Sequence, residues 1–308
     1  MADGRSLTSG LPVLVVLGPT ATGKTELAIR CARAFGGEVV SADSRYFYRE
    51  MNIGTAKPTL AEQAGIPHHL IDILDPDQPY SLGQFLDDVY RVIEDIGNRG
   101  GLPVVAGGTP QYLRATLEGW TVPEVAPDDE LRARLETEPT ETLFARLVTV
   151  DLESALRIGT TNKRRIIRAL EIHEKTGRTV SEQSGKQPPP YRFHVIGLTQ
   201  PRDLLYARID ERVRRMYAEG WLNEARELYE RGITATHPSM SAHGYREALE
   251  VVTGQTDVED AIARTCFIIH RYVRHQQTWF RRFDGVEWFD SSVAGWQEEA
   301  LDSVRTFL

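Results

Sequence analysis

The first 110 residues alternate between short apolar runs and longer amphipathic segments. Apolar, β-branched runs stand at residues 11–17 (LPVLVVL), 38–42 and 103–106, and a further strand is predicted at 69–74. Runs of this kind are typical of strands that are buried on both faces of a parallel sheet. Helical spacing follows at residues 24–35 and 82–98, and both segments stop at glycines that suit helix C-caps. Strands that alternate with helices predict a doubly wound α/β domain.

The pattern changes after residue 120. Residues 121–191 contain few strand-like runs and several helical ones, and they close at the three consecutive prolines 188–190. This stretch is predicted to be a helical insertion domain with proline-marked connections. The sheet resumes at 193–199, the chain is helical from 202, and a short strand is predicted at 286–289. The expected fold is therefore α/β, with a parallel sheet core formed by 11–120 and 192–308, a helical C-terminal region, and a loose tail at 1–10.

Composition indicates an ordinary globular protein. The chain has 36 Lys+Arg and 44 Asp+Glu, a net charge of −8, and is 41% hydrophobic, which excludes disordered, collagen-like and disulfide-scaffold classes. Cys31 and Cys266 are too few for a four-thiolate zinc site and are expected to be buried and free. The longest apolar run, 11–17, is too short to span a bilayer, and residues 1–10 lack a cationic signal-peptide region. We expect a cytoplasmic monomer without a membrane partner.

A phosphate-binding loop is predicted between the first strand and the first helix. It consists of Gly18, Pro19, Thr20, Ala21, Thr22, Gly23, Lys24 and Thr25, which match G-x-x-x-x-G-K-[ST] and make the expected core a P-loop fold. Backbone N–H groups and the helix N-terminus would face phosphate oxygens, Lys24 would add charge, and Thr25 would ligate Mg²⁺. The motif predicts the class of ligand but not the reaction. The loop could hold ATP in a kinase, GTP in a switch protein, or the diphosphate leaving group of a transferase. Asp43 and Asp72 both stand at or near strand ends, so an Mg²⁺-holding aspartate does not decide among these reactions.

Two further strand ends carry polar residues that can do chemistry. Asp43, Ser44, Arg45 and Tyr46 follow the strand at 38–42, and Gly107, Gly108 and Thr109 follow the strand at 103–106. In an open α/β sheet, ligands bind where the strands end, so these loops should face the same crevice as the phosphate loop. Asp43 is a candidate general base, and Thr109 could orient that base or the substrate. Either side chain could instead cap a helix or a turn.

Charge is segregated along this acidic chain. Residues 157–178 hold seven cationic side chains against two acidic ones, and residues 264–283 hold five arginines, no acid and several aromatic residues. Residues 124–141 are strongly acidic by contrast. Basic segments with interleaved aromatics favour binding to a polyanion such as RNA, where arginine planes and rings stack on unpaired bases. The alternative is a solvated helix face with its aromatics in the core.

Taken together, the motifs resemble one family over residues 13–290, the tRNA dimethylallyltransferases (tRNA isopentenyltransferases). The resemblance rests on GPTATGKT at 18–25, DSR with a tyrosine at 43–46, NIGTAKP at 52–58, GGT at 107–109, RRIIRALEI at 164–172, HGYREAL at 243–249 and RHQQTWFR at 274–281. It implies an enzyme that transfers a dimethylallyl group from dimethylallyl diphosphate to the N6 amine of the adenosine 3′ of the anticodon in tRNA, and releases diphosphate with the help of Mg²⁺.

The resemblance also assigns roles to residues. Asp43 would accept the amine proton, Thr109 would position the amine, the phosphate loop would hold the diphosphate, and the insertion at 121–191 would clamp the anticodon stem-loop. Contacts to tRNA map onto four stretches: Asp43, Ser44, Arg45 and Tyr46; Arg164, Arg165, Ile166, Ile167 and Arg168; Ser241, Ala242, His243, Gly244, Tyr245 and Arg246; and Arg274, His275, Gln276, Gln277, Thr278, Trp279, Phe280 and Arg281.

Three positions depart from the family pattern. Tyr46 stands where the family usually has Gln, Pro110 where it usually has Gly, and Arg274-His275-Gln276 where it often has Lys-Arg-Gln. Tyrosine cannot make a bidentate amide contact with a base, so Tyr46 bears on the sequence context of the target adenosine. Pro110 fixes φ beside Thr109 and could shift that turn. Alternative functions are a P-loop kinase or ATPase, a prenyl transferase acting on free adenine nucleotides, and a nucleic-acid-binding protein with an inactive site.

Overall fold

The computed structural model describes residues 10–308, which divide into two compact units. An α/β unit comprises residues 10–117 and 190–308, and a helical unit comprises Glu118–Pro189. The predicted tail at 1–10 lies outside the described residues except for Gly10. None of the helices within residues 10–308 combines the length and the apolar character that a membrane span requires.

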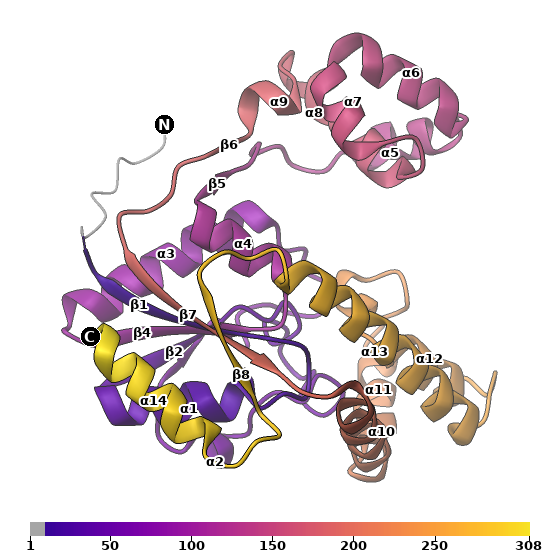
Figure 1. Ribbon diagram of the computed structural model, residues 1–308. Helices are drawn as coiled ribbons and strands as arrows, with labels where there is room; N and C mark the ends of the chain where they lie inside the picture. Colours follow the sequence, from indigo (N-terminus) through magenta and orange to yellow (C-terminus); the bar gives the residue numbers. More distant parts are fainter. Residues whose placement is uncertain (1–9) are drawn as a thin grey trace. The chain divides into compact units, whose positions relative to one another are not determined.

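The α/β unit is built on a six-stranded parallel sheet (Figure 1). Its strands, in the order β3-β2-β4-β1-β7-β8, are β3 (His68–His69), β2 (Gly37–Ser41), β4 (Leu102–Gly107), β1 (Pro12–Leu17), β7 (Arg192–Thr199) and β8 (Val286–Asp290). At the centre, Val15 of β1 is in register with Val105 of β4 and Val195 of β7. The predicted parallel, doubly wound α/β core is confirmed, and the apolar runs are its buried central strands.

Helices cover both faces of this sheet (Figure 1). One face carries α1 (Lys24–Phe35) and α14 (Trp296–Phe307), and the other carries α3 (Leu82–Asn98) and α4 (Pro110–Glu118). Residues of α1, among them Cys31, pack with Trp296, Ala300 and Val304 of α14. Cys31 and Cys266 are free and buried, as predicted.

The strand predicted at 69–74 is much shorter in the structure. Only His68–His69 pairs with β2, and the chain then leaves the sheet because Leu70 and Asp72 have positive φ values of 57° and 54°. Such values are incompatible with an extended strand. The prediction was wrong because most of the apolar run, with its β-branched isoleucines, belongs to a loop rather than to a strand at the sheet edge. The short α2 (Leu60–Gln63) precedes this edge strand.

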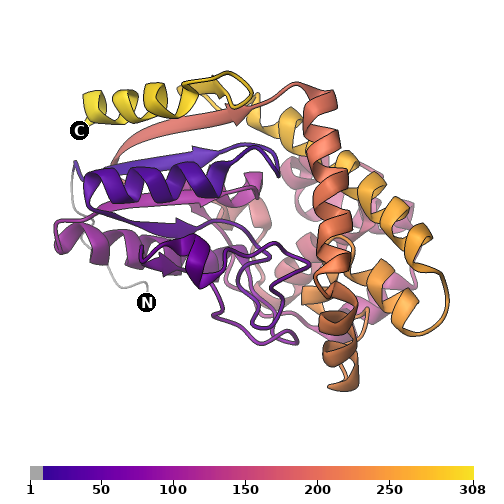
Figure 2. The same cartoon turned by 90° about the horizontal axis from the view of Figure 1, so that it is seen from below.

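The predicted helical C-terminal region stands beyond the carboxyl ends of the strands (Figure 2, orange segments). It consists of α10 (Arg202–Ala218), α11 (Trp221–Glu230), a short 3₁₀ helix (Pro238–Ser241), α12 (Tyr245–Val252) and α13 (Val258–Phe280). These helices share a core in which Trp221 and Tyr245 are fully buried together with Met51 from the loop after β2. That shared core fixes the helices to the loops that follow the strands.

The helical unit has its own core. Its helices are α5 (Asp129–Glu136), α6 (Thr140–Val150), α7 (Leu152–Ile158), α8 (Lys163–Thr176) and α9 (Val180–Gln183). Leu135, Leu143, Leu147, Ile166 and Leu170 form the centre of this core. Two short strands at the ends of the unit, β5 (Trp120–Thr121) and β6 (Gly185–Lys186), pair antiparallel. Each is two residues long, too short to leave a period-two signal in the sequence.

Candidate active site

The loop of residues 18–25 wraps between β1 and α1. Gly18 and Gly23 have φ values of 149° and 92°, and a Cβ on Gly18 would lie 2.6 Å from the carbonyl oxygen of Leu198, so glycine is required there. Gly23 caps α1 without a side-chain hydrogen bond. The N–H groups of the first turn therefore receive no hydrogen bond acceptor from a capping side chain at residue 23, and N–H groups at a helix N-terminus are suited to bind phosphate.

This loop opens onto a cavity at the carboxyl ends of β1, β2 and β4, within the α/β unit. Strand-end loops contribute Thr20, Lys24, Asp43, Arg45, Gly54, Thr55 and Gly108, and the C-terminal helical region contributes Ile209, Arg212, Val213, Met216, Ala242, His243, Ile269, Tyr272 and Gln276. The crevice that was predicted where the strands end is therefore present. The C-terminal helical region supplies more than half of its wall. Ala242, His243 and Gln276 in that wall belong to the stretches predicted to contact RNA, whereas the other six residues were not predicted.

Asp43 and Thr109 stand on neighbouring loops at this edge. The Asp43 carboxylate lines the cavity, and its Oδ1 accepts the Arg45 N–H at 3.0 Å. A Cβ placed on Gly108 would lie 3.6 Å from both Asp43 Oδ2 and Lys24 Nζ, so the two charges converge on one glycine. Thr109 Oγ1 accepts the Ser44 N–H at 3.1 Å, which ties the loop after β4 to the loop that carries Asp43. The Asp43 side chain thus caps a turn and also faces the cavity.

Lys24 and Arg212 give the cavity a cationic end. The pKa of Lys24 is lowered to about 8, chiefly by burial; the Asp43 carboxylate opposes this shift and the Arg212 guanidinium adds to it. Lys24 Nζ donates to the Pro19 carbonyl at 2.7 Å. Two clustered cations at a helix N-terminus suit a polyanionic ligand such as a diphosphate. Arg212 was missed in the sequence because it belongs to α10, whose placement over the strand ends has no local signal.

The cavity also has an apolar part. Ile209, Val213 and Met216 of α10 line it at helical spacing, together with Ala242 and Ile269. These side chains continue the wall from Arg212, so a cationic end and an apolar part lie within one cavity. An amphiphilic ligand with a charged head and a short hydrocarbon tail matches this division.

His243 and Tyr272 form an aromatic part of the same wall. Their ring centroids are 4.4 Å apart, and the Tyr272 hydroxyl donates to the Gly108 carbonyl at 3.1 Å. Burial, followed by the charges of Arg45 and Arg271, lowers the pKa of His243 to about 4. The imidazole is therefore neutral near pH 7, and it offers a ring face and one N–H rather than a cation.

The two unusual residues have local explanations. The Tyr46 hydroxyl donates to the Ala56 carbonyl at 2.9 Å and interacts with Thr25, and burial raises its pKa to about 12. Tyr46 does not line the cavity, so its side chain braces the loop at 52–58 rather than facing a ligand there. Pro110 is the first residue of α4, a helical position where its fixed φ is favourable. The turn beside Thr109 accommodates it.

Within the helical unit, the predicted RNA-contacting stretch 164–168 divides into exposed and buried residues. Arg164 and Arg165 are exposed. Ile166 and Ile167 are buried in the core of the unit, so their side chains cannot reach RNA. Arg168 pairs with the fully buried Glu171 and donates to the Val125 carbonyl at 2.7 Å. The prediction of RNA contacts here therefore narrows to Arg164 and Arg165.

The predicted stretches 241–246 and 274–281 divide in the same way. Arg246, Arg274, His275, Thr278 and Arg281 are exposed. The side chains of Ala242, Tyr245, Gln276 and Phe280 are buried. These four side chains therefore cannot contact RNA on the surface outside the cavity. Exposed arginines on one helix remain suited to phosphate groups.

The oxygen ligands at this edge fit Mg²⁺. No group of three or more His, Cys, Asp or Glu side chains gathers as a metal site anywhere in residues 10–308. Mg²⁺ needs no such cage, since it is usually held by one or two protein oxygens, water and substrate phosphates. Thr25 in the first turn of α1 supplies that kind of oxygen. Asp72 does not, because it pairs with Lys57.

Comparison with known proteins agrees with this geometry. The family model described as IPP transferase matches residues 46–283, and one described as isopentenyl transferase matches residues 11–72. A tRNA dimethylallyltransferase from Thermomicrobium roseum is 53% identical over 301 residues, which cover 96% of this chain and 92% of the relative. A second, from Roseiflexus sp., is 48% identical over 302 residues, covering 97% of this chain and 99% of the relative.

Solved structures give the same result. The full-length tRNA isopentenylpyrophosphate transferase of Bacillus halodurans matches with a TM-score of 0.72 and 38% identity, covering 97% of this chain and 95% of its own. A eukaryotic dimethylallyltransferase acting on tRNA matches with a TM-score of 0.81 and 29% identity, covering 96% and 78%. The family resemblance seen in the motifs is confirmed, and the chain belongs to the IPP transferase family.

Proposed function

We propose that this protein transfers a dimethylallyl group from dimethylallyl diphosphate to the N6 amine of the adenosine 3′ of the anticodon in tRNA. The observation that carries the proposal is the single cavity that joins Lys24 and Arg212 to the Asp43 carboxylate and to an apolar wall. Its relatives are tRNA dimethylallyltransferases that align over nearly the whole chain. The exposed arginines of the two units add charge of the sign that tRNA requires.

The cationic end of the cavity would hold the donor diphosphate. Lys24, Arg212 and the N–H groups in the first turn of α1 would stabilise the negative charge that grows on the diphosphate as the C–O bond breaks. Thr25 would hold Mg²⁺, which when bound supplies further charge stabilisation to the leaving oxygens. The apolar side chains of Ile209, Val213 and Met216 would hold the dimethylallyl group and exclude water from it.

Asp43 would act on the acceptor. The lone pair of the adenine N6 amine attacks the allylic carbon, the C–O bond breaks, and its electrons leave with the diphosphate. The N6 proton passes to the Asp43 carboxylate. Thr109 would hold the Asp43 loop through its contact with Ser44. The adenine must leave its stack to reach the cavity, which an anticodon loop permits more readily than a duplex.

The test is an incubation of the protein with Mg²⁺, dimethylallyl diphosphate and an unmodified tRNA that carries adenosine beside the anticodon. Digestion followed by mass spectrometry should show adenosine with one added dimethylallyl group. A tRNA with guanosine at that position should remain unchanged. Modification of free adenine nucleotides instead would identify a small-molecule prenyl transferase, and phosphate transfer from ATP would identify a kinase.

Variants of one loop residue separate catalysis from binding. Asp43→Asn should lower kcat by about 100-fold or more because it removes a general base, with tRNA affinity changed far less. Asp77→Asn, an exposed aspartate outside the cavity, is the matched control and should behave as the unaltered protein. Equal losses of kcat and of tRNA affinity in Asp43→Asn would make Asp43 a binding residue.

A further inference from the structure

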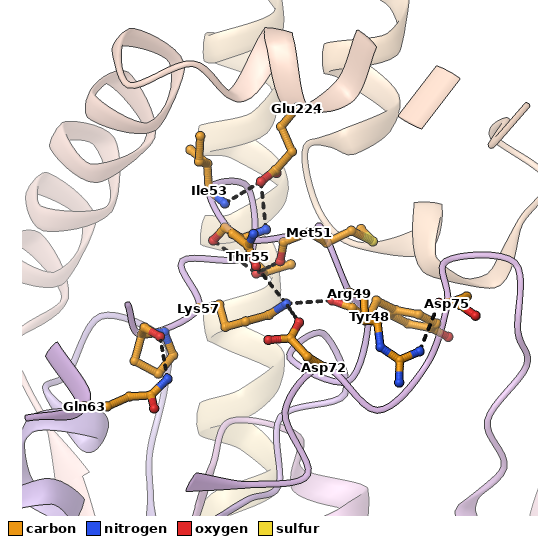
Figure 3. A network of polar contacts seen from close by, with 12 residues as sticks. Tyr48, Arg49, Met51, Ile53, Thr55, Lys57, Gln63, Asp72, Asp75 and Glu224 are labelled. Carbon is orange, nitrogen blue, oxygen red and sulfur yellow. Dashed lines mark hydrogen bonds and ion pairs between the residues drawn. The ribbon is translucent and has the colours of Figure 1, made fainter. Parts of the chain in front are cut away.

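A buried carboxylate on α11 holds the loop that follows Tyr48. Glu224 is 9% exposed, and its Oε2 accepts the N–H groups of Asn52 and Ile53, each at 2.7 Å. Its Oε1 accepts the Gly54 N–H at 3.0 Å. Figure 3 shows this carboxylate above the loop, with the backbone N–H groups directed at it. Three consecutive N–H groups on one carboxylate form a strong, charge-assisted anchor.

Tyr245 completes the anchor. Its hydroxyl donates to Glu224 Oε1 at 2.5 Å, and burial together with the Glu224 charge raises its pKa well above the usual value, so the phenol stays protonated as a donor. Glu224 therefore accepts four hydrogen bonds and needs no cation. It does not line the cavity, so its effect on a ligand must pass through the loop that it holds.

The far end of the same loop is anchored as well. Lys57 Nζ, on a side chain only 4% exposed, donates to the Tyr48 carbonyl at 2.6 Å and pairs with Asp72 at 2.5 Å (Figure 3). The Tyr46 hydroxyl holds the Ala56 carbonyl between these ends. Residues 52–58 thus form a loop that is fixed at both ends and near its middle, independently of any ligand.

Gly54 and Thr55 are the part of this loop that lines the cavity. A Cβ on Gly54 would lie 2.0 Å from Trp221 Nε1 and 2.6 Å from the Tyr245 ring. The Gly54 backbone is therefore seated against two buried aromatic side chains and cannot move back into them. It can move away from them only by breaking the hydrogen bonds to Glu224. The Glu224 carboxylate consequently fixes where this part of the cavity wall stands.

We propose that Glu224 is a positioning residue that fixes the Gly54–Thr55 wall and thereby limits the length of the hydrocarbon chain the donor can carry. The inference rests on the proposed function, because the donor is taken to be a prenyl diphosphate. A rigid wall fits one chain length and rejects a longer one by overpacking, whereas a loosened wall yields to it. Loosening also leaves a short donor less well aligned for attack.

The test compares Glu224→Gln with Glu227→Gln. Glutamine keeps the volume of residue 224 but directs an NH₂ group at backbone N–H groups, so the loop loses acceptors. Glu227 is exposed on the same helix, and its variant is expected to match the unaltered protein. Each protein is assayed for kcat and KM with dimethylallyl diphosphate and with geranyl diphosphate, and for affinity toward an anticodon stem-loop RNA.

Glu224→Gln should lower kcat/KM for dimethylallyl diphosphate by about tenfold or more, by the cost of misplacing a reactant. The ratio of geranyl to dimethylallyl kcat/KM should rise about fivefold or more as the wall yields to additional CH₂ groups. RNA affinity should stay within about twofold, since the phosphate contacts are unaltered. Loss of kcat/KM for both donors in equal proportion, with an unchanged ratio, would overturn the proposal.

Two further outcomes are separated by design. An unaltered protein that transfers no prenyl group to tRNA would refute the proposed function itself, before any variant is compared. If Glu224→Gln does not fold, as judged by thermal denaturation, Tyr245→Phe carries the test because it removes one donor to the carboxylate and keeps the ring. Its donor ratio should shift in the same direction by a smaller factor, and an unchanged ratio in a folded Tyr245→Phe protein would overturn the proposal.

Discussion

Gln276 of α13 accepts a hydrogen bond from the N–H of Thr20 in the 18–25 loop, over a distance of 3.0 Å. Its Nε2 donates at 2.5 Å to the carbonyl of Gly108, the residue before Thr109. Gln276 is 1% exposed, and both the oxygen and the nitrogen of its amide make a hydrogen bond. A single buried amide thus joins a helix with exposed arginines to the loop after β1 and the loop after β4.

Replacing Gln276 by Glu should uncouple these loops. A carboxylate can still accept from Thr20 but cannot donate to the Gly108 carbonyl, and it adds negative charge beside the diphosphate site. We expect kcat/KM for the donor to fall by about 10- to 100-fold, the scale of a small misplacement at a reacting centre. Steady-state kinetics at varied donor concentration measure the change in kcat/KM, and fluorescence anisotropy measures the change in RNA affinity separately.

Gln277→Glu makes the same charge change one residue further along α13. It reports how an added negative charge on this helix alters RNA affinity. The prediction for Gln276→Glu fails if its loss lies mainly in RNA affinity and equals the loss in Gln277→Glu.

Arg212 should contribute to donor binding. The Arg212→Gln substitution removes one of the two cations at the cationic end of the cavity, so the KM for dimethylallyl diphosphate should rise by about tenfold, the order of a charge-assisted contact. RNA affinity should change little. Arg215→Gln on the same helix is the control, because Arg215 is exposed and lies near Glu219. A KM that is equal in the two variants would remove Arg212 from the donor site.

The strand-end residues were predictable, and the reason lies in sheet topology. Lys24, Asp43 and Gly108 follow β1, β2 and β4, which are neighbours in the order β2-β4-β1. Residues that follow adjacent parallel strands must meet at one edge. Motif recognition in the loops was therefore enough to place Lys24 and Asp43 in one cavity wall. Thr109, predicted beside them, does not line the cavity and contacts Ser44 instead.

Arg212 and Glu224 could not be found in this way. Each belongs to a helix that packs into the shared core with Trp221 and Tyr245, and this core joins segments distant in sequence. Periodicity identifies the helices but not which turn faces a particular loop. The basic stretches present the same difficulty, since the buried Glu171 engages Arg168 and leaves Arg165 exposed. The number of cationic side chains in these stretches therefore exceeds the number that are free to contact RNA phosphates.

Donor binding should weaken as the pH rises through the pKa of Lys24. In the free protein this pKa is about 8, chiefly because of burial. A bound polyanion favours the ammonium form, so the complex holds more protons than the free protein above pH 8. Linkage then requires the Kd of Mg²⁺–pyrophosphate to increase with pH, by up to about tenfold per unit.

Isothermal titration calorimetry between about pH 7 and pH 9.5, a range that brackets this titration, measures the effect. Lys24→Arg is the control, because arginine stays charged over this pH range. The pH dependence of Kd in this variant is the part that comes from titration of pyrophosphate itself. Identical pH profiles for the two proteins would contradict the assigned role of the Lys24 ammonium.

The last prediction separates two neighbouring arginines of α8. Arg165 is exposed, so Arg165→Ala should weaken tRNA binding and reduce the slope of log K against log salt by about 0.7 to 0.9, the effect of one phosphate contact. Its free energy of unfolding should be unchanged. Binding titrations at several salt concentrations, with urea denaturation of the same samples, measure both quantities.

Arg168→Ala should show the reverse. The Arg168 guanidinium pairs with Glu171, whose side chain is 0% exposed, and is itself 34% exposed. Glu171 keeps Arg132 and the Asp128 N–H as partners, so the loss of unfolding free energy should be about 1–2 kcal/mol rather than the larger cost of an unpaired buried charge. The slope of log K against log salt for RNA binding should equal that of the unaltered protein. A reduced salt slope in a fully stable Arg168→Ala protein would return this arginine to the RNA-binding surface and would mean that the Glu171 pair opens when RNA binds.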